Sequence, residues 1–158
     1  MRQTRVPPVL VTGATGRVGR IVIDLLVEAG VPVRAMTHRS EAAATLPANV
    51  EVVIGDLTAP ESLDVALRGV RAVFLVWSVP PTTAPAVVQR LASQVRRVVF
   101  LSSPHKTPHP FFQQANPAAQ LRADIERLIM AAGVESPRSF REWVADHASA
   151  FTERAPSS

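Results

Sequence analysis

The sequence predicts an α/β fold built on a doubly wound parallel sheet. Five short apolar runs rich in β-branched residues recur at residues 9–12, 33–37, 50–54, 72–76 and 98–101, and the intervals are long enough for helices. Runs this short and this apolar are typical of strands buried on both faces, as in a parallel sheet. The chain has 158 residues, 47% of them apolar, which is enough for one hydrophobic core.

Apolar residues at helical spacing fill the intervals. In the first interval Ile21, Val22, Leu25 and Leu26 predict the buried face of a helix, which Gly30 would end. After the third strand, Thr58 and Glu61 resemble a capping box that opens a short helix. Residues 86–94 predict a helix after the fourth strand, although prolines precede it.

The pattern changes after the fifth strand. Residues 104–117 are rich in proline and predict an irregular loop, and residues 118–133 then show helical spacing. A turn follows where a sixth strand is expected, and one more amphipathic helix begins near Ser139. Its apolar face consists of Phe140, Trp143, Val144 and Phe151. We therefore expect one α/β domain over residues 1–133 and a short C-terminal helical segment over residues 134–158.

Composition excludes several function classes. The chain has no cysteine, which removes disulfides, thiolate metal sites and cysteine nucleophiles, and we expect no metal site. The net charge is only +4, and no helix concentrates the arginines, so nucleic acid is not an expected partner. No apolar run approaches the length of a membrane span or of a secretory signal, so we expect no membrane partner and a cytoplasmic location.

The most informative segment follows the first strand. Residues 9–20 read Val-Leu-Val-Thr-Gly-Ala-Thr-Gly-Arg-Val-Gly-Arg, which places three glycines at G-x-x-G-x-x-G spacing between a predicted strand and a predicted helix. Such glycines let backbone N–H groups approach a pyrophosphate at the positive end of the helix. The alternative is that they only form a turn and pack helix on strand. The coincidence of strand, motif and helix favours a dinucleotide site.

The segment Thr12-Gly-Ala-Thr-Gly-Arg-Val-Gly19 resembles the phosphate loop of NmrA-like proteins, a group of atypical short-chain dehydrogenases/reductases. Gly-Asp-Leu at 55–57, residues 69–76 and residues 97–103 extend the resemblance over about residues 8–133. It implies a Rossmann-like sheet with five strands in order 3-2-1-4-5. It also implies that Asp56 and Leu57 meet the adenine, that the end of the fourth strand lies beneath the nicotinamide ribose, and that Ser102 flanks the active site. From the residues alone, Asp56 is equally explained as a turn residue.

The loop and the resemblance together give the predicted cofactor-binding residues: Thr12, Gly13, Thr15, Gly16, Arg17, Val18, Gly19, Arg39, Asp56, Leu57, Val76, Trp77 and Ser102. Among dinucleotides, a free ribose 2'-hydroxyl requires a carboxylate after the second strand, whereas a 2'-phosphate requires a cation. The second strand ends without an acid, and Arg17 and Arg39 supply guanidinium groups. We therefore expect NADP(H) in preference to NAD(H), unless these arginines belong to a solvated surface.

Catalysis is harder to assign. Many short-chain reductases donate a proton from a tyrosine assisted by a lysine four residues later, but this chain has no tyrosine, and its single lysine is Lys106 in the proline-rich loop. Ser102 and His105 remain as the predicted catalytic residues, with His109 as a further donor.

Family members continue after the helix ending near Gly133 into a further strand and a long substrate-binding portion, whereas here Glu135 is followed directly by a segment similar to their last helix. We therefore predict an NADP(H)-binding oxidoreductase that transfers hydride to a small carbonyl or quinone. The alternative is a non-catalytic NADP(H) sensor, or a truncated remnant whose 134–158 segment is what remains of the substrate portion. Covering the last helix and the fifth strand would favour a homodimer.

Overall fold

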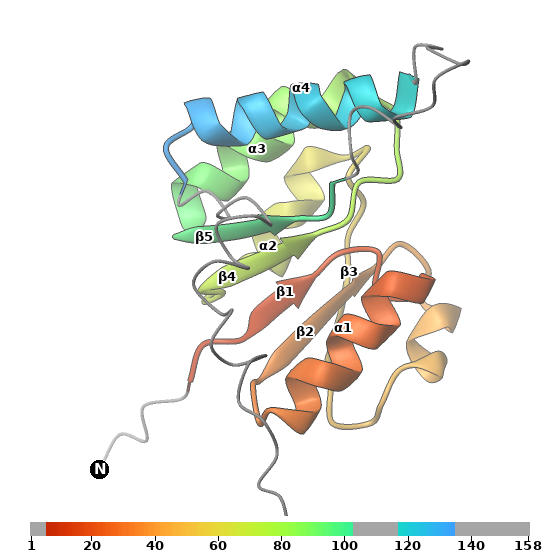
Figure 1. Ribbon diagram of the computed structural model, residues 1–158. Coiled ribbons are helices and arrows are strands. Elements are labelled where there is room, and N and C mark those ends of the chain that lie inside the picture. The colour runs from red at the N-terminus through yellow and green to blue at the C-terminus, as the bar shows by residue number, and fades with distance from the viewer. Residues whose placement is uncertain (1–5, 103–116, 135–158) are drawn as a thin grey trace, which may run out of the picture.

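The computed structural model describes residues 6–102 and 117–134, which form a five-stranded parallel sheet with helices on both faces (Figure 1). The strands lie in the order β3-β2-β1-β4-β5, which confirms the predicted class and order. They are β1 (Val9–Val11), β2 (Val33–Thr37), β3 (Glu51–Ile54), β4 (Ala72–Leu75) and β5 (Arg97–Phe100). Because the chain runs outward from β1 to β3 and then returns to β4, the strand order reverses between β1 and β4. Clefts for ligands form at such a reversal, at the carboxyl ends of the strands.

The helices connect these strands in chain order. They are α1 (Arg17–Glu28), α2 (Leu63–Ala66), α3 (Ala84–Gln94) and α4 (Pro117–Ala131), with 3-10 turns η1 (Glu41–Thr45), η2 (Pro60–Ser62) and η3 (Pro81–Thr83). α3 and α4 cover one face of the sheet together with α2, and α1 covers the other (Figure 1). The predicted helix after Ser139 lies outside the described residues, so it stays a prediction, as does the domain boundary after residue 133.

Two separate cores hold the layers together. Leu10, Val73 and Val98 point to the side of α2, α3 and α4 and are fully buried there. Val11 and Ala35 point to the other side and pack against Ile23 of α1. The alternation of Leu10 and Val11 between the two cores is what a strand covered on both faces requires, and it explains why the strand sequences are continuously apolar.

The predicted buried face of α1 is right for Val22 and Leu26 and wrong for Ile21 and Leu25. Ile21 and Leu25 were expected to face the sheet, but they are 53% and 59% exposed. The buried face is instead formed by Gly19 and Ile23, with Val22 and Leu26 packed at its margin. Nearly every position between Ile21 and Val27 is apolar, so the sequence contains two overlapping stripes, and the rotation is decided by the close approach of Gly19 to the preceding loop.

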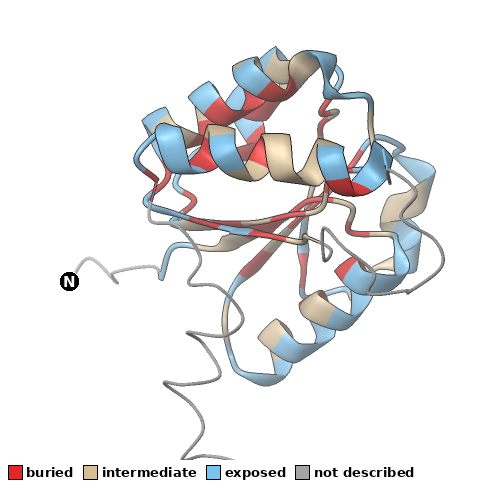
Figure 2. Cartoon of the chain, turned by 45° about the horizontal axis from the view of Figure 1, so that its top comes forward, coloured by how far each residue is buried: buried red, intermediate tan, exposed pale blue. Residues whose placement is uncertain are grey.

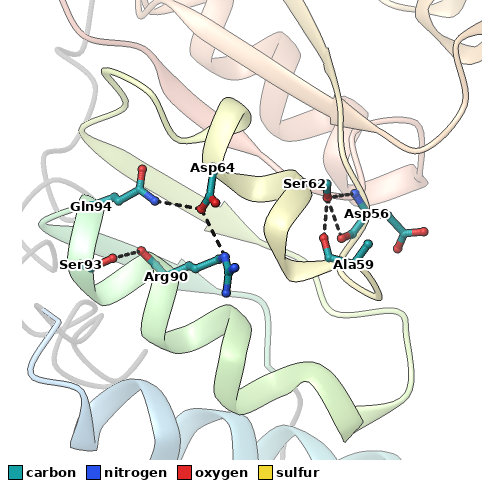
Figure 3. A network of polar contacts seen from close by, with 7 residues as sticks. All are labelled: Asp56, Ala59, Ser62, Asp64, Arg90, Ser93 and Gln94. Atoms are coloured by element: carbon teal, nitrogen blue, oxygen red, sulfur yellow. Dashed lines mark hydrogen bonds and ion pairs between the residues drawn. The ribbon is translucent and has the colours of Figure 1, made fainter.

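Helices α2 and α3, which lie on the same face of the sheet, are joined by a polar network (Figure 3). Asp64 of α2 accepts hydrogen bonds at Oδ1 from Nε of Arg90, at 3.2 Å, and from Nε2 of Gln94, at 3.4 Å. Both donors lie on α3, so this one carboxylate links the two helices. The contact lies at the surface and contributes less than the apolar core beneath it.

The sheet is unevenly covered. In the region that the structure describes, β5 is an edge strand, and Val99 on it is 37% exposed on the same side as α1. Figure 2 shows the contrast between the buried strands and the exposed outer surface of α1. Among the described helices, none is both long enough and apolar enough to cross a membrane.

Candidate nucleotide-binding site

The glycine loop between β1 and α1 is a tight turn. Gly13 has a φ of +59°, a conformation that favours glycine, and a Cβ there would lie 3.1 Å from Cβ of Val76. The N–H of Gly16 donates to the carbonyl of Gly13 at 3.0 Å, which closes the turn. The absence of a side chain at Gly13 therefore lets the loop pack closely against Val76 at the carboxyl end of β4.

Gly19 brings α1 against this loop. A Cβ on Gly19 would lie 2.2 Å from the carbonyl oxygen of Gly13 and 3.0 Å from Cα of Ala14, both backbone atoms. The glycine therefore permits a helix–loop contact that alanine would not. Gly19, the third glycine of the motif, accordingly has the packing role that the alternative interpretation of the motif predicts. Gly13 and Gly16, the other two, line the cavity described below.

The first turn of α1 presents unpaired amide groups. The N-cap residue is Gly16, which has no side chain to cap the helix, and the turn begins with Arg17, Val18 and Gly19. The first N–H groups of a helix have no partner within it, and the helix dipole makes this end positive. Together with the basic residue at its start, the turn is suited to an anion.

Thr12 fastens the carboxyl ends of β1 and β4 to one another. Its Oγ1 accepts a hydrogen bond from the N–H of Val76 at 2.8 Å and donates to the carbonyl of Val76 at 3.1 Å. The Thr12 side chain is almost fully buried. It thus holds Val76, which lines the cavity described below, whereas Thr12 itself is not a lining residue.

A cavity of about 260 Å³ opens at these strand ends. Residues from the glycine loop and from the ends of β2, β3 and β4 line it: Gly13, Thr15, Gly16, Met36, Thr37, His38, Gly55, Asp56, Leu57, Val76, Ser78 and Val79. The cavity therefore lies where the strand order reverses, next to the first turn of α1. No group of three or more metal-ligating side chains occurs within residues 6–102 and 117–134.

Asp56 is held by the turn that follows β3. Its Oδ1 accepts the N–H of Thr58 at 2.8 Å. Oγ of Ser62 accepts the N–H of Asp56 at 2.8 Å and donates to the carbonyl of Ala59 (Figure 3). The hydrogen bonds from Thr58 hold the pKa of Asp56 below its ordinary value, and the positive charge of His38 adds to this. The carboxylate is therefore ionised at neutral pH.

This turn replaces the predicted capping box. The first residue of η2 follows Ala59, and no side chain caps the N-terminus of η2 or α2. Thr58 donates its backbone N–H to Asp56 instead of accepting from the helix. The Asx turn at Asp56 uses the residues that the capping box would need.

The loop after β1 is also tied to η1. Arg20 donates from Nε to the carbonyl of Thr15 at 3.0 Å and from Nη2 to Oγ1 of Thr45 at 3.2 Å. Arg20 also lines a separate cavity of about 330 Å³ between α1 and η1. Among the described residues, no glycine lines that cavity, in contrast to the cavity at the strand ends described above.

The structure gathers only part of the predicted site at the cavity. Gly13, Thr15, Gly16, Asp56, Leu57 and Val76 line it, and Arg17, Val18 and Gly19 form the adjoining helix turn. Arg39 and Ser102 are not among its lining residues, so their cofactor contacts stay predictions. Trp77 is 5% exposed and packs in the core, with its indole N–H donating to the carbonyl of Val79 at 2.6 Å.

The predicted binding residues lack six that line the cavity: Met36, Thr37, His38, Gly55, Ser78 and Val79. The available signal was their position at or just beyond the carboxyl ends of the second and fourth strands, where a parallel sheet binds ligands. Of the predicted catalytic residues, Ser102 follows β5, and its Oγ is buried with no hydrogen-bond partner among the described residues. His105 lies outside the described residues.

Comparison with known proteins explains this arrangement. A family model described as NAD(P)H-binding matches residues 13–155. The chain belongs to this NAD(P)H-binding family. The predicted resemblance to NmrA-like atypical short-chain dehydrogenases/reductases is confirmed.

Individual relatives agree with the family. The chain is 46% identical over 96 residues to a (4-alkanoyl-5-oxo-2,5-dihydrofuran-3-yl)methyl phosphate reductase of Streptomyces griseus, a match covering 60% of this chain and 34% of that protein. It is 40% identical over 74 residues to an NAD(P)H azoreductase of Xenophilus azovorans, covering 46% and 26% of the two chains. The triphenylmethane reductase of Citrobacter sp. complexed with NADP(H) is 27% identical with a TM-score of 0.67, over 80% of this chain and 46% of that one. The matches thus span less than half the length of these relatives.

Proposed function

We propose that this NAD(P)H-binding chain binds NADP(H) at the carboxyl ends of its strands and uses it to reduce a small carbonyl compound or quinone. The observation that carries the proposal is the union of three features at one place: a bare glycine loop, an unpaired helix turn and a cavity at the reversal of strand order. The reductases among its relatives, one of them complexed with NADP(H), support the same reaction class.

The residues present fit a dinucleotide. Gly13 and Gly16 line the cavity where a pyrophosphate would lie, and the first amides of α1 supply donors and a positive dipole end. Asp56 and Leu57 would hold the adenine, and Val76 with the following loop would lie under the nicotinamide ribose. When bound, the cofactor supplies hydride from its nicotinamide ring.

The preference for NADP(H) rests on charge near the end of β2. Thr37, His38 and Arg39 follow one another there, where binding of a free 2'-hydroxyl would call for an acid. Arg17 adds a guanidinium group at the start of α1. Arg17 and Arg39 would hold the 2'-phosphate, and a guanidinium group suits phosphate geometry.

The proton for the reduced substrate has two predicted sources. Ser102 follows β5 with a buried Oγ that has no hydrogen-bond partner in the described part of the chain, and it would donate to the oxygen of a substrate carbonyl. His105 is the second source. Positioned proton donors contribute about 10² to 10⁴ in rate, and a serine hydroxyl alone is a weak acid.

The absence of tyrosine from the sequence supports a second candidate, an NADP(H)-binding module without turnover. The two functions share the binding step and differ in turnover. Thermal unfolding with NADPH and with NADH tests the shared step: ligand at 100 times its Kd stabilises the folded state by about 2.7 kcal/mol. We expect the larger shift with NADPH. Equal shifts would contradict the NADP(H) preference, and no shift with either would contradict the site.

Turnover separates the two candidates. NADPH oxidation is followed at its absorbance maximum with quinones, enals and aldehydes as acceptors. We expect slow turnover, because without tyrosine the proton comes from Ser102, His105 or water. Rates on the order of 10 per second, typical of enzymes, would contradict this expectation and exclude the binding module. No acceptor-dependent oxidation at all would favour the binding module.

A further inference from the structure

We propose that His38 makes the discrimination between NADP(H) and NAD(H) depend on pH, because its imidazole pairs with the 2'-phosphate only when it is protonated. This inference rests on the proposed binding of NADP(H). The part of the NADP(H) preference that depends on pH is assigned to His38, which lines the cavity. The part that does not depend on pH is assigned to Arg17 and Arg39.

The fold presents His38 at the cavity in a defined way. It is the first residue after β2, and it is exposed, whereas Thr37 before it is buried. Oγ1 of Thr37 accepts the N–H of Arg39 at 3.2 Å and also lies 3.2 Å from the carbonyl of Arg39, to which it donates. These two bonds close a turn around His38, so that His38 and not Arg39 lines the cavity.

Four other charged groups lie on the elements that border His38. Asp56 lines the same cavity, Arg39 follows His38, Glu41 begins η1, and Arg17 begins α1. His38 is near enough to Asp56 to stabilise its carboxylate, and the pKa of Asp56 lies below its ordinary value. The Asp56 carboxylate therefore keeps its charge at neutral pH, the range in which imidazole groups change theirs.

The direction in which the preference changes with pH distinguishes the contribution of His38 from that of the ligand's own phosphate. A phosphate monoester loses its second proton near pH 6, so its own titration strengthens binding to cations as the pH rises. Attraction to a protonated imidazole acts the other way, since it disappears when a rise in pH removes the proton. A preference that weakens with rising pH therefore indicates a histidine.

The experiment measures the Kd of NADP⁺ and of NAD⁺ by calorimetry at about pH 6.5, 7.5 and 8.5. The oxidised forms tolerate acid, and the two ligands differ only in the 2'-phosphate, so changes at the glycine loop cancel in the ratio of their Kd values. If the 2'-phosphate binds about tenfold more tightly beside a protonated imidazole than beside a neutral one, the preference for NADP⁺ falls about fivefold between about pH 6.5 and 8.5.

Three variants identify the group. His38→Asn keeps a polar side chain without a charge that titrates, and its preference should not fall with pH. His38→Arg should keep a high preference throughout, and Arg39→Gln should lower the preference by the same factor at each pH. The melting temperature of each variant checks its fold, which an exposed position should leave unchanged.

The outcomes distinguish the two proposals. A fall in the wild type that is absent from His38→Asn supports the inference. An equal fall in His38→Asn overturns it, because another histidine then titrates, and a constant or rising preference in the wild type overturns it while NADP(H) binding stands. If neither nucleotide binds the wild type, both the proposed function and this inference are contradicted.

Discussion

Gly16 and Gly19 belong to one loop, yet the structure requires them for different reasons. A Cβ on Gly19 would lie 2.2 Å from a backbone oxygen of Gly13, so even alanine must displace the loop or the helix. We expect Gly19→Ala to lower the free energy of unfolding by about 1 to 3 kcal/mol, the usual cost of overpacking. Gly16→Ala is the control, because its Cβ would lie 3.2 Å from the same oxygen, and a small shift of the loop would accommodate it. Equal stability of the two variants in denaturant titrations would contradict this packing role.

Gly16→Val tests binding and not folding. Gly16 is exposed, lines the cavity and has ordinary dihedral angles, so valine should obstruct the pyrophosphate, while its Cβ would lie 3.2 Å from the carbonyl oxygen of Gly13. We expect a folded variant with a modestly lower melting temperature than the wild type and no rise on adding NADPH or NADH. A rise equal to that of the wild type would place the nucleotide elsewhere.

Asp56 gives stability a defined pH dependence. Its folded pKa is lowered by the hydrogen bonds from Thr58, so its contribution is present above the unfolded pKa and is lost as the pH falls through the folded one. We expect Asp56→Asn to be less stable than the wild type near neutral pH, with a difference that shrinks toward about pH 3. Denaturant unfolding at both pH values measures it. A difference that stays constant would show that the charge contributes nothing.

Among the elements, β1 and β4 are joined beyond their backbone ladder by Thr12. Thr12→Val keeps the shape of the side chain but leaves the N–H and carbonyl of Val76 without this partner. We expect a loss of about 1 to 3 kcal/mol in the free energy of unfolding, as for a polar group left unpaired inside a protein. Thr12→Ser keeps the hydroxyl and should recover most of the loss. If both variants lose the same amount, the methyl group and not the hydrogen bonds is responsible.

The strands could be predicted to within one or two residues because burial on both faces leaves a strong signal, a short run that is apolar throughout. The glycine loop could be predicted because its spacing coincides with a strand and a helix. The rotation of α1 could not, since the contact at Gly19 that decides it is tertiary. The choice of His38 over Arg39 at the cavity depends on a turn closed by Thr37, and residue types alone do not reveal that turn.

Across the whole molecule, exposed apolar side chains lie on the side of the sheet that α1 covers. Val18, Ile21 and Leu25 form an exposed stripe on α1, and Val99 is exposed on β5 on the same side of the sheet. A separate prediction from the sequence is an amphipathic helix that begins near Ser139 and carries an apolar face. Burial of such surface is favourable, and exposed strand edges are usually covered.

We therefore expect the chain to form a homodimer. Light scattering after size-exclusion chromatography measures its mass, and the paired substitution Ile21→Glu with Leu25→Glu should shift it toward the monomer without unfolding, since both side chains are exposed. Asp24→Glu, on the same helix, is a matched control that should not change the mass. A monomeric wild type at high concentration would mean that the chain covers this face by itself.

The buried indole of Trp77 gives the molecule an optical probe. It is shielded from water, its N–H is bound to the carbonyl of Val79, and its chain neighbours Val76, Ser78 and Val79 line the cavity. Its emission should therefore lie at short wavelength and respond when a nucleotide enters, while the absorption band of a reduced nicotinamide overlaps that emission and quenches it by energy transfer. Trp143→Phe would leave Trp77 as the single source of this signal, so that occupancy could be followed in real time without any attached label.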